Sequence, residues 1–249
     1  MNVDIPQKSD GMPPIGEQEG KRDAIEAMFD KIAPHYDLLN RVLSLGIDQW
    51  WRHRAINCLV QDKPTRVLDV ATGTADVAIM AAKKLRPQEV VGIDIADEML
   101  RLGRAKVAAQ GQGKYIKLLR ADAAQLPFSN DTFDAAVVAY GVRNFEDLGE
   151  GLSEIRRVLR PDGKLVVLEF SKPRISPVKE LYQIYSWVLL PLIGRLVSGD
   201  PAAYTYLPKS VEAFPDGTEF LDYMAHAGYD DLQWKQLTFG ISSLYEGRA

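Results

Sequence analysis

Short apolar runs alternate with segments of helical periodicity in the middle of the chain. The apolar runs, which are rich in β-branched residues, occupy positions 66–70, 90–94, 115–119, 135–139 and 165–170. Helical patterns occupy positions 77–85, 98–107 and 148–159. This alternation predicts βαβ units and a mostly parallel sheet. Because the runs show little polar alternation, we expect helices on both faces of the sheet and ligands beyond the carboxyl ends of its strands.

The two ends of the chain follow other patterns. Residues 1–22 combine proline, glycine and charged residues with few apolar groups, which predicts a flexible tail outside a single domain formed by the rest. Residues 23–57 have helical spacing and predict two or three helices before the core at 58–170. Prolines then interrupt 171–215, which predicts an insertion, and residues 216–249 predict a helix and an antiparallel hairpin.

The predicted insertion contains a nearly uniform apolar segment, residues 181–193, with two tyrosines and a tryptophan. Such aromatic residues favour membrane interfaces, and the four basic and two acidic residues between 171 and 200 suit an anionic bilayer. The segment is shorter than the about 20 residues of a membrane-spanning helix. We therefore expect contact with a membrane surface and no span, the alternative being a buried helix that closes the domain.

Composition and charge narrow the functional classes. Apolar residues make up 46% of the 249 residues and charged residues 26%, which excludes collagen-like, disulfide-scaffold and wholly disordered chains. The net charge of −4 gives no positive field to attract phosphate backbones, so we expect no nucleic-acid partner. The three histidines, His35, His53 and His226, are scattered without carboxylates at ligand spacing, so we expect no metal site.

The sequence also predicts where the protein resides. Cys58 is the only cysteine, so no internal disulfide can form, which fits a reducing cytoplasm. The N-terminus lacks the apolar core of a secretory signal and carries acidic residues that transit peptides avoid. We expect a cytoplasmic protein that is peripheral at the inner face of the cytoplasmic membrane. The sequence leaves open whether it forms a homo-oligomer.

An acidic residue stands at the carboxyl end of each of the first three predicted strands. Asp69 precedes a small-residue turn around Gly73, Asp94 lies 21 residues after that glycine, and Asp122 follows the third strand. A carboxylate beside the turn would repel a pyrophosphate but favour a sulfonium or ammonium group, and S-adenosylmethionine carries both. Asp94 at the second strand can accept hydrogen bonds from two ribose hydroxyls. Asp122 after the third strand can accept one from the exocyclic amine of adenine.

Two other interpretations of these acids compete with a site for S-adenosylmethionine. Aspartates at strand ends also serve as helix caps and turn formers, but three in succession favour a binding site. A nicotinamide site would require Gly-x-Gly-x-x-Gly, whereas only Gly73 is glycine here and alanines occupy positions 75 and 78. The acid at position 69 also disfavours a dinucleotide.

From Phe29 to Arg248 the chain resembles the ubiquinone/menaquinone-biosynthesis C-methyltransferases. The resemblance rests on two long motifs and two shorter ones. The long motifs are YDLLNRVLS at 36–44, followed by the tryptophans at 50–51, and RVLRPDGKLVVLEFS at 157–171. The short ones are LPF at 126–128 and GVRN at 141–144.

The resemblance implies a Rossmann-like class I methyltransferase fold. That fold has a mostly parallel seven-stranded sheet, a terminal antiparallel hairpin and, over 23–57, an N-terminal helical lid. S-adenosylmethionine would be the cofactor. In addition to Asp69 and Gly73, the cofactor-binding residues implied are Thr74, Asp94, Asp122, Ala123 and Tyr140.

Three positions depart from the pattern of the family. Asp48 stands where the family usually has histidine, and Asp162 stands where it has a second glycine. The turn 71–75 has alanine at both ends instead of glycine. Because L-residues disfavour positive φ, these alanines are expected to avoid that conformation.

The implied reaction is C-methylation of the quinol ring of a prenylated precursor, with demethylmenaquinol favoured. The alternatives are the ubiquinone-pathway substrate 2-methoxy-6-polyprenyl-1,4-benzoquinol, or a non-catalytic lipid- or cofactor-binding module on the same fold. Such a module would be expected to lose one of the three acids at the strand ends, and all three are present. The apolar insertion would then form a groove for the prenyl tail.

The chemistry of the ring indicates candidate catalytic residues. Methylation at carbon requires a ring hydroxyl to be ionised or polarised, and an unperturbed phenol has a pKa of about 10. Arg143 would stabilise the phenolate, and Asn144 would hold a water that takes the ring proton. Tyr36 would face the substrate from the lid, together with Asp37, whereas His35 is a weaker candidate for the base.

Overall fold

The computed structural model describes residues 20–189 and 202–249. Its strands are β1 Arg66–Val70, β2 Glu89–Asp94, β3 Ile116–Arg120, β4 Phe133–Ala139, β5 Leu159–Phe170, β6 Asp230–Leu237 and β7 Ser242–Arg248. Its α-helices are α1 Lys21–Leu43, α2 Ile47–Asn57, α3 Asp76–Leu85, α4 Asp97–Ala109, α5 Leu148–Val158, α6 Val178–Ile184, α8 Ala202–Ala213 and α9 Thr218–His226. Short helical turns are η1 Val142–Asn144, η2 Tyr185–Leu189 and η3 Thr238–Gly240.

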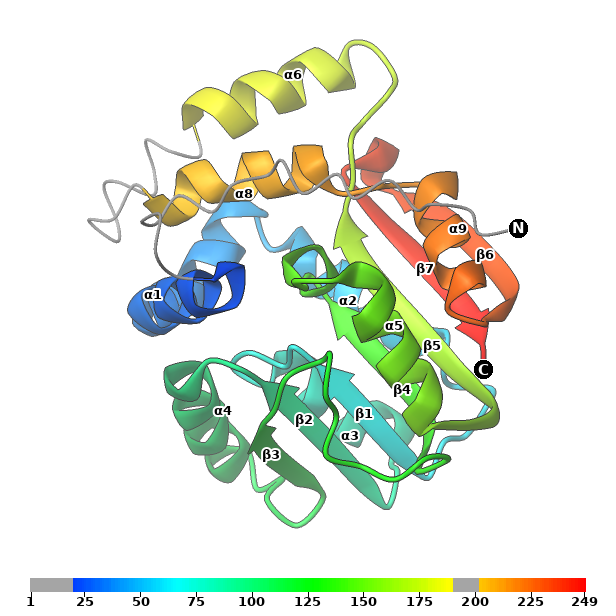
Figure 1. The fold of residues 1–249 in the computed structure, drawn as a ribbon. Coiled ribbons are helices and arrows are strands. Elements are labelled where there is room, and N and C mark those ends of the chain that lie inside the picture. Colours follow the sequence, from blue (N-terminus) through cyan, green and yellow to red (C-terminus); the bar gives the residue numbers. More distant parts are fainter. Residues whose placement is uncertain (1–19, 190–201) are drawn as a thin grey trace.

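The strands form one seven-stranded sheet of order β3-β2-β1-β4-β5-β7-β6 (Figure 1). Strands β1 to β5 are parallel, and β7 is antiparallel to both β5 and β6. The predicted sheet and its terminal hairpin are therefore confirmed. The strand order reverses at β1, where Val70 lies between Ile93 of β2 and Val138 of β4. A crevice at such a reversal is the usual ligand site of this architecture.

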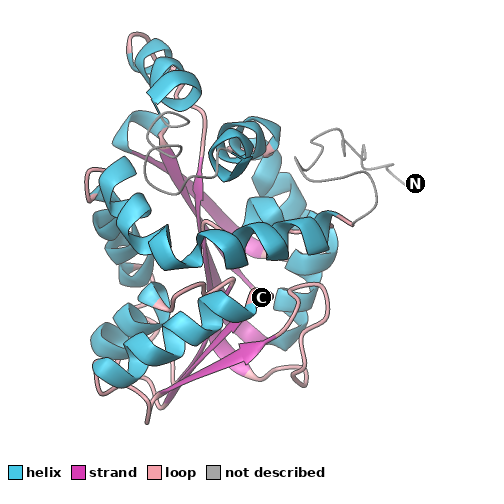
Figure 2. Ribbon diagram, turned by 90° about the vertical axis from the view of Figure 1, so that its left-hand side faces the viewer, coloured by secondary structure: helices cyan, strands magenta, loops and turns pink. Residues whose placement is uncertain are grey.

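Helices cover both faces of the sheet, as Figure 2 shows. Successive residues of β1 alternate between two apolar cores, with Leu68 in the core that includes α5 and α9, and Val67 in the core that includes α3. A further core holds Trp51 of α2 against Leu168 of β5. Burial on both faces explains why the predicted strands were apolar without alternation.

The N-terminal helices form the predicted cover over the carboxyl edge of the sheet, where α1 lies between α4 and α8 (Figure 1). Helix α1 begins at Lys21, so it takes in the last two residues of the predicted tail, of which 1–19 lie outside the described residues. Apolar residues of α1, including Ile25 and Met28, pack against Met99 of α4. Charged contacts join α1 to the body: Arg22 to Asp122, Glu26 to Arg120, Asp37 to Lys106 and Arg41 to Asp76.

Within the predicted insertion, 171–215, the structure describes helix α6, the turn η2 and helix α8, and residues 190–201 lie outside the described residues. No residue of α6 is buried, and Leu181 and Ile184 are 63% and 58% exposed. Trp187 of η2 is half exposed. The buried-helix alternative therefore does not describe α6. In the described ranges no helix is long and apolar enough to cross a membrane.

The turn after β1 corrects one expectation. Ala71 and Ala75 both adopt positive φ, 55° and 66°, as does Gly73 at 54°. An L-residue pays about 1–2 kcal/mol for this conformation. The methyl group of Ala71 meets Gly141, where an added Cβ would lie only 2.4 Å from it. The turn keeps its shape with alanine because its neighbours provide the room.

Glycine at position 71 is expected to raise the free energy of unfolding by about 0.5–1 kcal/mol, because relief of positive φ outweighs the added freedom of the unfolded chain. The matched control is Ala105→Gly, in the exposed middle of α4, which should lower that free energy by about 1 kcal/mol. Chemical denaturation of both variants measures the difference. Equal destabilisation by the two changes would contradict the left-handed conformation at Ala71.

Candidate active site

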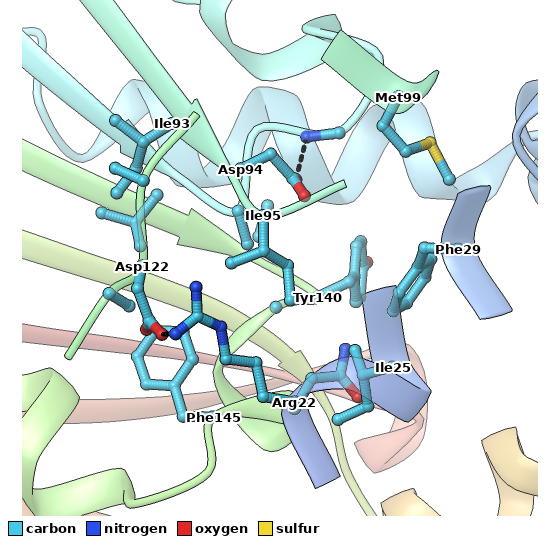
Figure 3. Close-up of a pocket in the computed structure, with 18 of the residues that line it drawn as sticks. Arg22, Ile25, Phe29, Ile93, Asp94, Ile95, Met99, Asp122, Tyr140 and Phe145 are labelled. Carbon is cyan, nitrogen blue, oxygen red and sulfur yellow. Dashed lines mark hydrogen bonds and ion pairs between the residues drawn. The ribbon is translucent and has the colours of Figure 1, made fainter. Parts of the chain in front are cut away.

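A first cavity lies beyond the carboxyl ends of β1, β2 and β4 and encloses about 780 Å³, its open mouth included. Figure 3 shows its apolar walls, with Ile93 and Ile95 from the end of β2 and Ile25 and Phe29 from α1. The structure brings seven of the predicted site residues to its lining: Tyr36, Gly73, Asp94, Asp122, Ala123, Tyr140 and Asn144. The cavity occupies the crevice predicted from the strand pattern.

Asp94 is bound to the turn that follows β1. Its carboxylate accepts hydrogen bonds from the backbone N–H of Gly73 at 2.8 Å and of Ala96 at 3.0 Å. Burial raises the pKa of Asp94, and these backbone donors oppose the rise. Each carboxylate oxygen can accept a second hydrogen bond, so the residue can fix the turn and also meet ligand hydroxyls.

Asp122 follows β3 and lines the first cavity. One oxygen accepts a hydrogen bond from the backbone N–H of Ala124 at 2.9 Å, and the other is 3.1 Å from a guanidinium nitrogen of Arg22 (Figure 3). The side chain is about a quarter exposed, so this ion pair is weak. Ala123 beside it presents a small apolar surface to the cavity.

Two predicted cofactor residues, Asp69 and Thr74, lie behind the turn and do not line the first cavity. The Asp69 carboxylate accepts a 2.5 Å hydrogen bond from Thr72, and burial raises its pKa to about 7. The Thr74 hydroxyl donates to Asp37 of α1 at 2.6 Å and lies 2.9 Å from the Lys106 ammonium. In this conformation both residues shape the turn, and direct contact with a cofactor stays a prediction.

A second cavity lies between α1, α2 and α8 and the segment formed by α6 and η2. Its lining is largely aromatic and apolar, with Trp51, Phe170, Tyr182 and Tyr206 among the contributors. Phe29, Tyr36 and Tyr140 line both cavities and so form the wall between them. The two cavities are therefore adjacent, with these three aromatic side chains between them.

Tyr140 follows β4 directly and adopts a φ of 61°. Positive φ is strained for a bulky side chain and is typical of functional sites. Its ring packs against Phe170 with centroids 4.5 Å apart, and it is buried. Packing of the ring therefore holds the strained residue in the wall.

Arg143, in η1, forms a buried ion pair with Glu169 of β5 at 2.6 Å. Its Nη1 also donates to the Tyr140 carbonyl at 2.6 Å, and its Nε donates to Ser210 of α8 at 3.3 Å. Among the described residues Nη2 makes no hydrogen bond, and the side chain lines the second cavity. Burial lowers the pKa of the guanidinium, but the Glu169 carboxylate and Tyr206 raise it by more, so the group stays charged.

A second buried ion pair faces the same cavity, between Arg52 and Asp48 on successive turns of α2. Ser44 and Gln49 also donate to the Asp48 carboxylate, at 2.8 and 3.2 Å. The Arg52 guanidinium lies 5.4 Å from the centre of the Tyr140 ring. The second cavity thus holds two fixed guanidinium groups in a largely apolar and aromatic lining.

Two of the predicted catalytic residues, Tyr36 and Asn144, both line the first cavity, and Tyr36 also lines the second. Burial raises the pKa of Tyr36, although Arg52 opposes the rise, so its phenol is a donor at neutral pH. Asn144 lines the first cavity, and its Oδ1 accepts a 3.0 Å hydrogen bond from Tyr206 of α8. The side-chain amide of Asn144 is left to donate.

Comparison with known proteins identifies the family. The model of the ubiE/COQ5 methyltransferase family matches residues 17–248. The chain belongs to this family. It is 44% identical, over 98% of both chains, to a protein of Bacteroides fragilis named demethylmenaquinone methyltransferase. It is also 45% identical to the ubiquinone/menaquinone biosynthesis C-methyltransferase UbiE of Geobacter sulfurreducens, over 91% of this chain and 89% of that one.

Solved structures confirm the fold predicted for this ubiE/COQ5 methyltransferase. The crystal structure of the cyclase SpnF matches with a TM-score of 0.65 at 15% identity, over 95% of this chain and 98% of that one. A Haemonchus contortus phosphoethanolamine N-methyltransferase, solved with S-adenosylmethionine, matches with a TM-score of 0.55 at 14% identity, over 74% of this chain and 48% of that one. At these identities the likeness extends to the fold.

Sequence reasoning about this methyltransferase missed two residues of the second cavity region, Glu169 and Arg52. Glu169 lies in a motif used for the resemblance, but its pairing with Arg143 joins positions 26 residues apart and left no local signal. Arg52 could have been found from the sequence, because Asp48 and Arg52 are four residues apart on a predicted helix and an acid and a base at that spacing form ion pairs.

The histidines of the methyltransferase lie away from both cavities. His35, His53 and His226 are exposed, and none lines either cavity. Within residues 20–189 and 202–249, no group of three or more metal-ligating side chains is assembled. The weaker proposal of His35 as the catalytic base finds no geometric support here.

Proposed function

We propose that this methyltransferase binds S-adenosylmethionine in the first cavity and methylates a ring carbon of a prenylated quinol in the second, with demethylmenaquinol as the substrate. The observation that carries the proposal is the wall shared by the two cavities, which Phe29, Tyr36 and Tyr140 form. The name of the Bacteroides fragilis relative supports the choice of substrate.

The lining of the first cavity fits S-adenosylmethionine. Asp94 offers charged acceptors for ribose hydroxyls, and Asp122 offers one for an exocyclic amine. Ile95 and Met99 give an apolar surface for a flat base. Gly73 has no side chain, whereas a Cβ atom at this position would project to 3.9 Å from Tyr36 and take up space in the cavity. When bound, S-adenosylmethionine supplies an electrophilic methyl group.

Arg143 activates the ring in this proposal. With Nη1 and Nε engaged by Glu169, the Tyr140 carbonyl and Ser210, the guanidinium is fixed and Nη2 is left for a ring oxygen. A fixed cation in a largely apolar cavity lowers the pKa of the adjacent ring hydroxyl and stabilises the phenolate. The resulting electron density on the ring carbon makes that carbon nucleophilic.

Proton loss completes the reaction after the methyl group has been transferred. The ring carbon must release its hydrogen to restore aromaticity, and the protonated Tyr36 phenol is unsuited to accept it. The amide of Asn144, oriented by Tyr206, holds a water that accepts this proton. Asn144 acts as a positioning residue because it acts through the water.

A direct assay tests the proposal. The protein is incubated with methyl-labelled S-adenosylmethionine and, separately, with demethylmenaquinol and with 2-methoxy-6-polyprenyl-1,4-benzoquinol, and the products are analysed by mass spectrometry. Label on the ring carbon of the first quinol is the expected result. Label on the second alone would assign the ubiquinone-pathway reaction, and binding without label would favour a non-catalytic module.

The insertion contributes a tail groove and a membrane-facing surface in this proposal. Tyr182 and Tyr185 line the second cavity, whereas Leu181, Ile184 and Trp187 do not line it and are at least half exposed. An adjoining hollow shares Tyr182 with the second cavity, and its rim carries three basic residues: Lys172, Arg174 and Lys179. A quinol tail entering there would come from an anionic bilayer.

Replacing Leu181 and Trp187 together by serine is expected to weaken binding to phosphatidylglycerol vesicles about 10- to 100-fold, because two exposed apolar side chains no longer enter the lipid. Tyr115→Ser, an exposed aromatic site beside β3, is the matched control and should leave binding unchanged. Vesicle co-sedimentation measures both. Undiminished binding of the double variant would rule out α6 and η2 as the membrane-facing surface.

A further inference from the structure

The guanidinium of Arg52 is a buried cation with unused hydrogen-bond donors. Its side chain is only 7% exposed, and its Nη1 pairs with Asp48. Its Nε and Nη2 make no hydrogen bond among the described residues, while the side chain lines the second cavity. Because these free donors belong to a side chain that lines a largely apolar cavity, the arrangement favours an oxygen-bearing ligand that supplies acceptors at this point.

Asp48 fixes the orientation of Arg52. Its carboxylate accepts from Ser44, Gln49 and Arg52 and is itself only 5% exposed on its side chain. With three donors satisfied, the carboxylate holds the guanidinium in place and balances its charge. Arg52 therefore presents donors to the cavity without introducing a net charge there.

Each of the two cations of the second cavity lies near a different ring of an aromatic pair. The guanidinium carbon of Arg52 lies 5.4 Å from the Tyr140 ring centre, and that of Arg143 lies 5.5 Å from the Phe170 ring centre. Tyr140 and Phe170 pack against each other at 4.5 Å. The cations come from different elements, α2 and η1, and both act on the hydroxyl of Tyr36.

We propose that Arg52, oriented by Asp48, binds the second oxygen of a ring whose first oxygen meets Arg143, and so selects rings that carry two oxygens para to each other. This inference rests on the proposed function. The para oxygens of a quinol project from opposite ends of the ring, so one guanidinium cannot reach both. In a largely apolar cavity each oxygen requires its own donor.

The test compares two rings in two proteins. One ring is a short-prenyl 1,4-dihydroxynaphthalene, and the other lacks the hydroxyl para to the one beside the acceptor carbon. Arg52→Met is expected to reduce the preference for the dihydroxy ring, measured as the ratio of kcat/KM values, about 10- to 100-fold. Intrinsic reactivity of each ring is the same in both proteins and cancels from the comparison.

A matched control and a second variant distinguish the loss of ring recognition from a general effect of the substitution. Arg54→Met makes the same change on the same helix, where the guanidinium lies 5.9 Å from the Trp50 ring, and should leave the preference unchanged. If Arg52→Met alone does not fold because Asp48 is left unpaired, Arg52→Met with Asp48→Asn keeps the site neutral. An unchanged preference in a folded variant overturns the inference.

Calorimetric affinities separate this inference from the proposed function. Each ring is titrated into the wild type and the variants, and the same loss of preference is expected without turnover. If the wild type methylated neither ring, the proposed function would fail, whereas the titrations would still report whether Arg52 recognises the second oxygen. Equal affinities of the wild type for both rings would contradict the role of Arg52 directly.

Discussion

Lysine in place of Arg143 is expected to lower turnover about 100-fold and to change the affinity for S-adenosylmethionine less than twofold. The Nη1 of the arginine donates hydrogen bonds to Glu169 and to the Tyr140 carbonyl, and its Nε donates to Ser210. A single ammonium can satisfy Glu169 or the ring oxygen but cannot reproduce this geometry. Steady-state kinetics and titration calorimetry measure the two quantities.

The pH dependence of this defect identifies its cause. Raising the pH ionises the quinol without help, so the ratio of wild-type to variant turnover should shrink as pH rises toward the phenol pKa of about 10. The control is Arg174→Lys, whose side chain is 60% exposed, and it should behave as the wild type. A defect that does not vary with pH, or one confined to cofactor affinity, would make Arg143 a structural residue.

Alanine in place of Asp94 is expected to weaken S-adenosylmethionine binding about 30- to 150-fold, equivalent to about 2–3 kcal/mol, because a charged acceptor for two hydroxyls is lost. The structure adds a second effect. The N–H groups of Gly73 and Ala96 lose their acceptor as well, so the free energy of unfolding should fall by about 1–3 kcal/mol in a protein that still folds.

Asp97→Ala is the matched control for this change. It removes a carboxylate three residues further along, whose side chain is 61% exposed and pairs only with Arg120 among the described residues. Titration calorimetry and a melting curve of both variants separate binding from stability. Cofactor affinity equal to that of the wild type in the Asp94 variant would contradict its placement on the ribose.

The sequence predicted the frame of the site because regular elements have regular periods. Parallel strands bring their carboxyl ends to one edge of the sheet. Residues at the ends of neighbouring strands therefore lie close together, however long the chain segment between them is. Gly73, Asp94 and Asp122 were therefore predictable as neighbours, and the structure places all three around the first cavity. Their positions depend on strand order and register.

Side-chain direction and long-range pairing could not be predicted in this way. Asp69 near the end of β1 and Thr74 in the turn after it lie close to Gly73 in the chain, but their side chains bond to Thr72 and to Asp37 of α1 and do not line the first cavity. The expectation that Ala71 and Ala75 avoid positive φ was wrong, because room for their methyl groups depends on distant neighbours such as Gly141. The partner of Arg143 was likewise set by packing between η1 and β5.

Helix α1 lines both cavities and is joined to the body by an apolar core and by ion pairs near its surface. A ligand that contacts α1 in one cavity fixes the position of the helix, and that same position completes the lining of the other cavity. The two binding equilibria therefore share the cost of ordering α1, and each ligand must raise the affinity for the other by the same factor. Salt screens such ion pairs, so this cooperativity should grow as ionic strength loosens the helix.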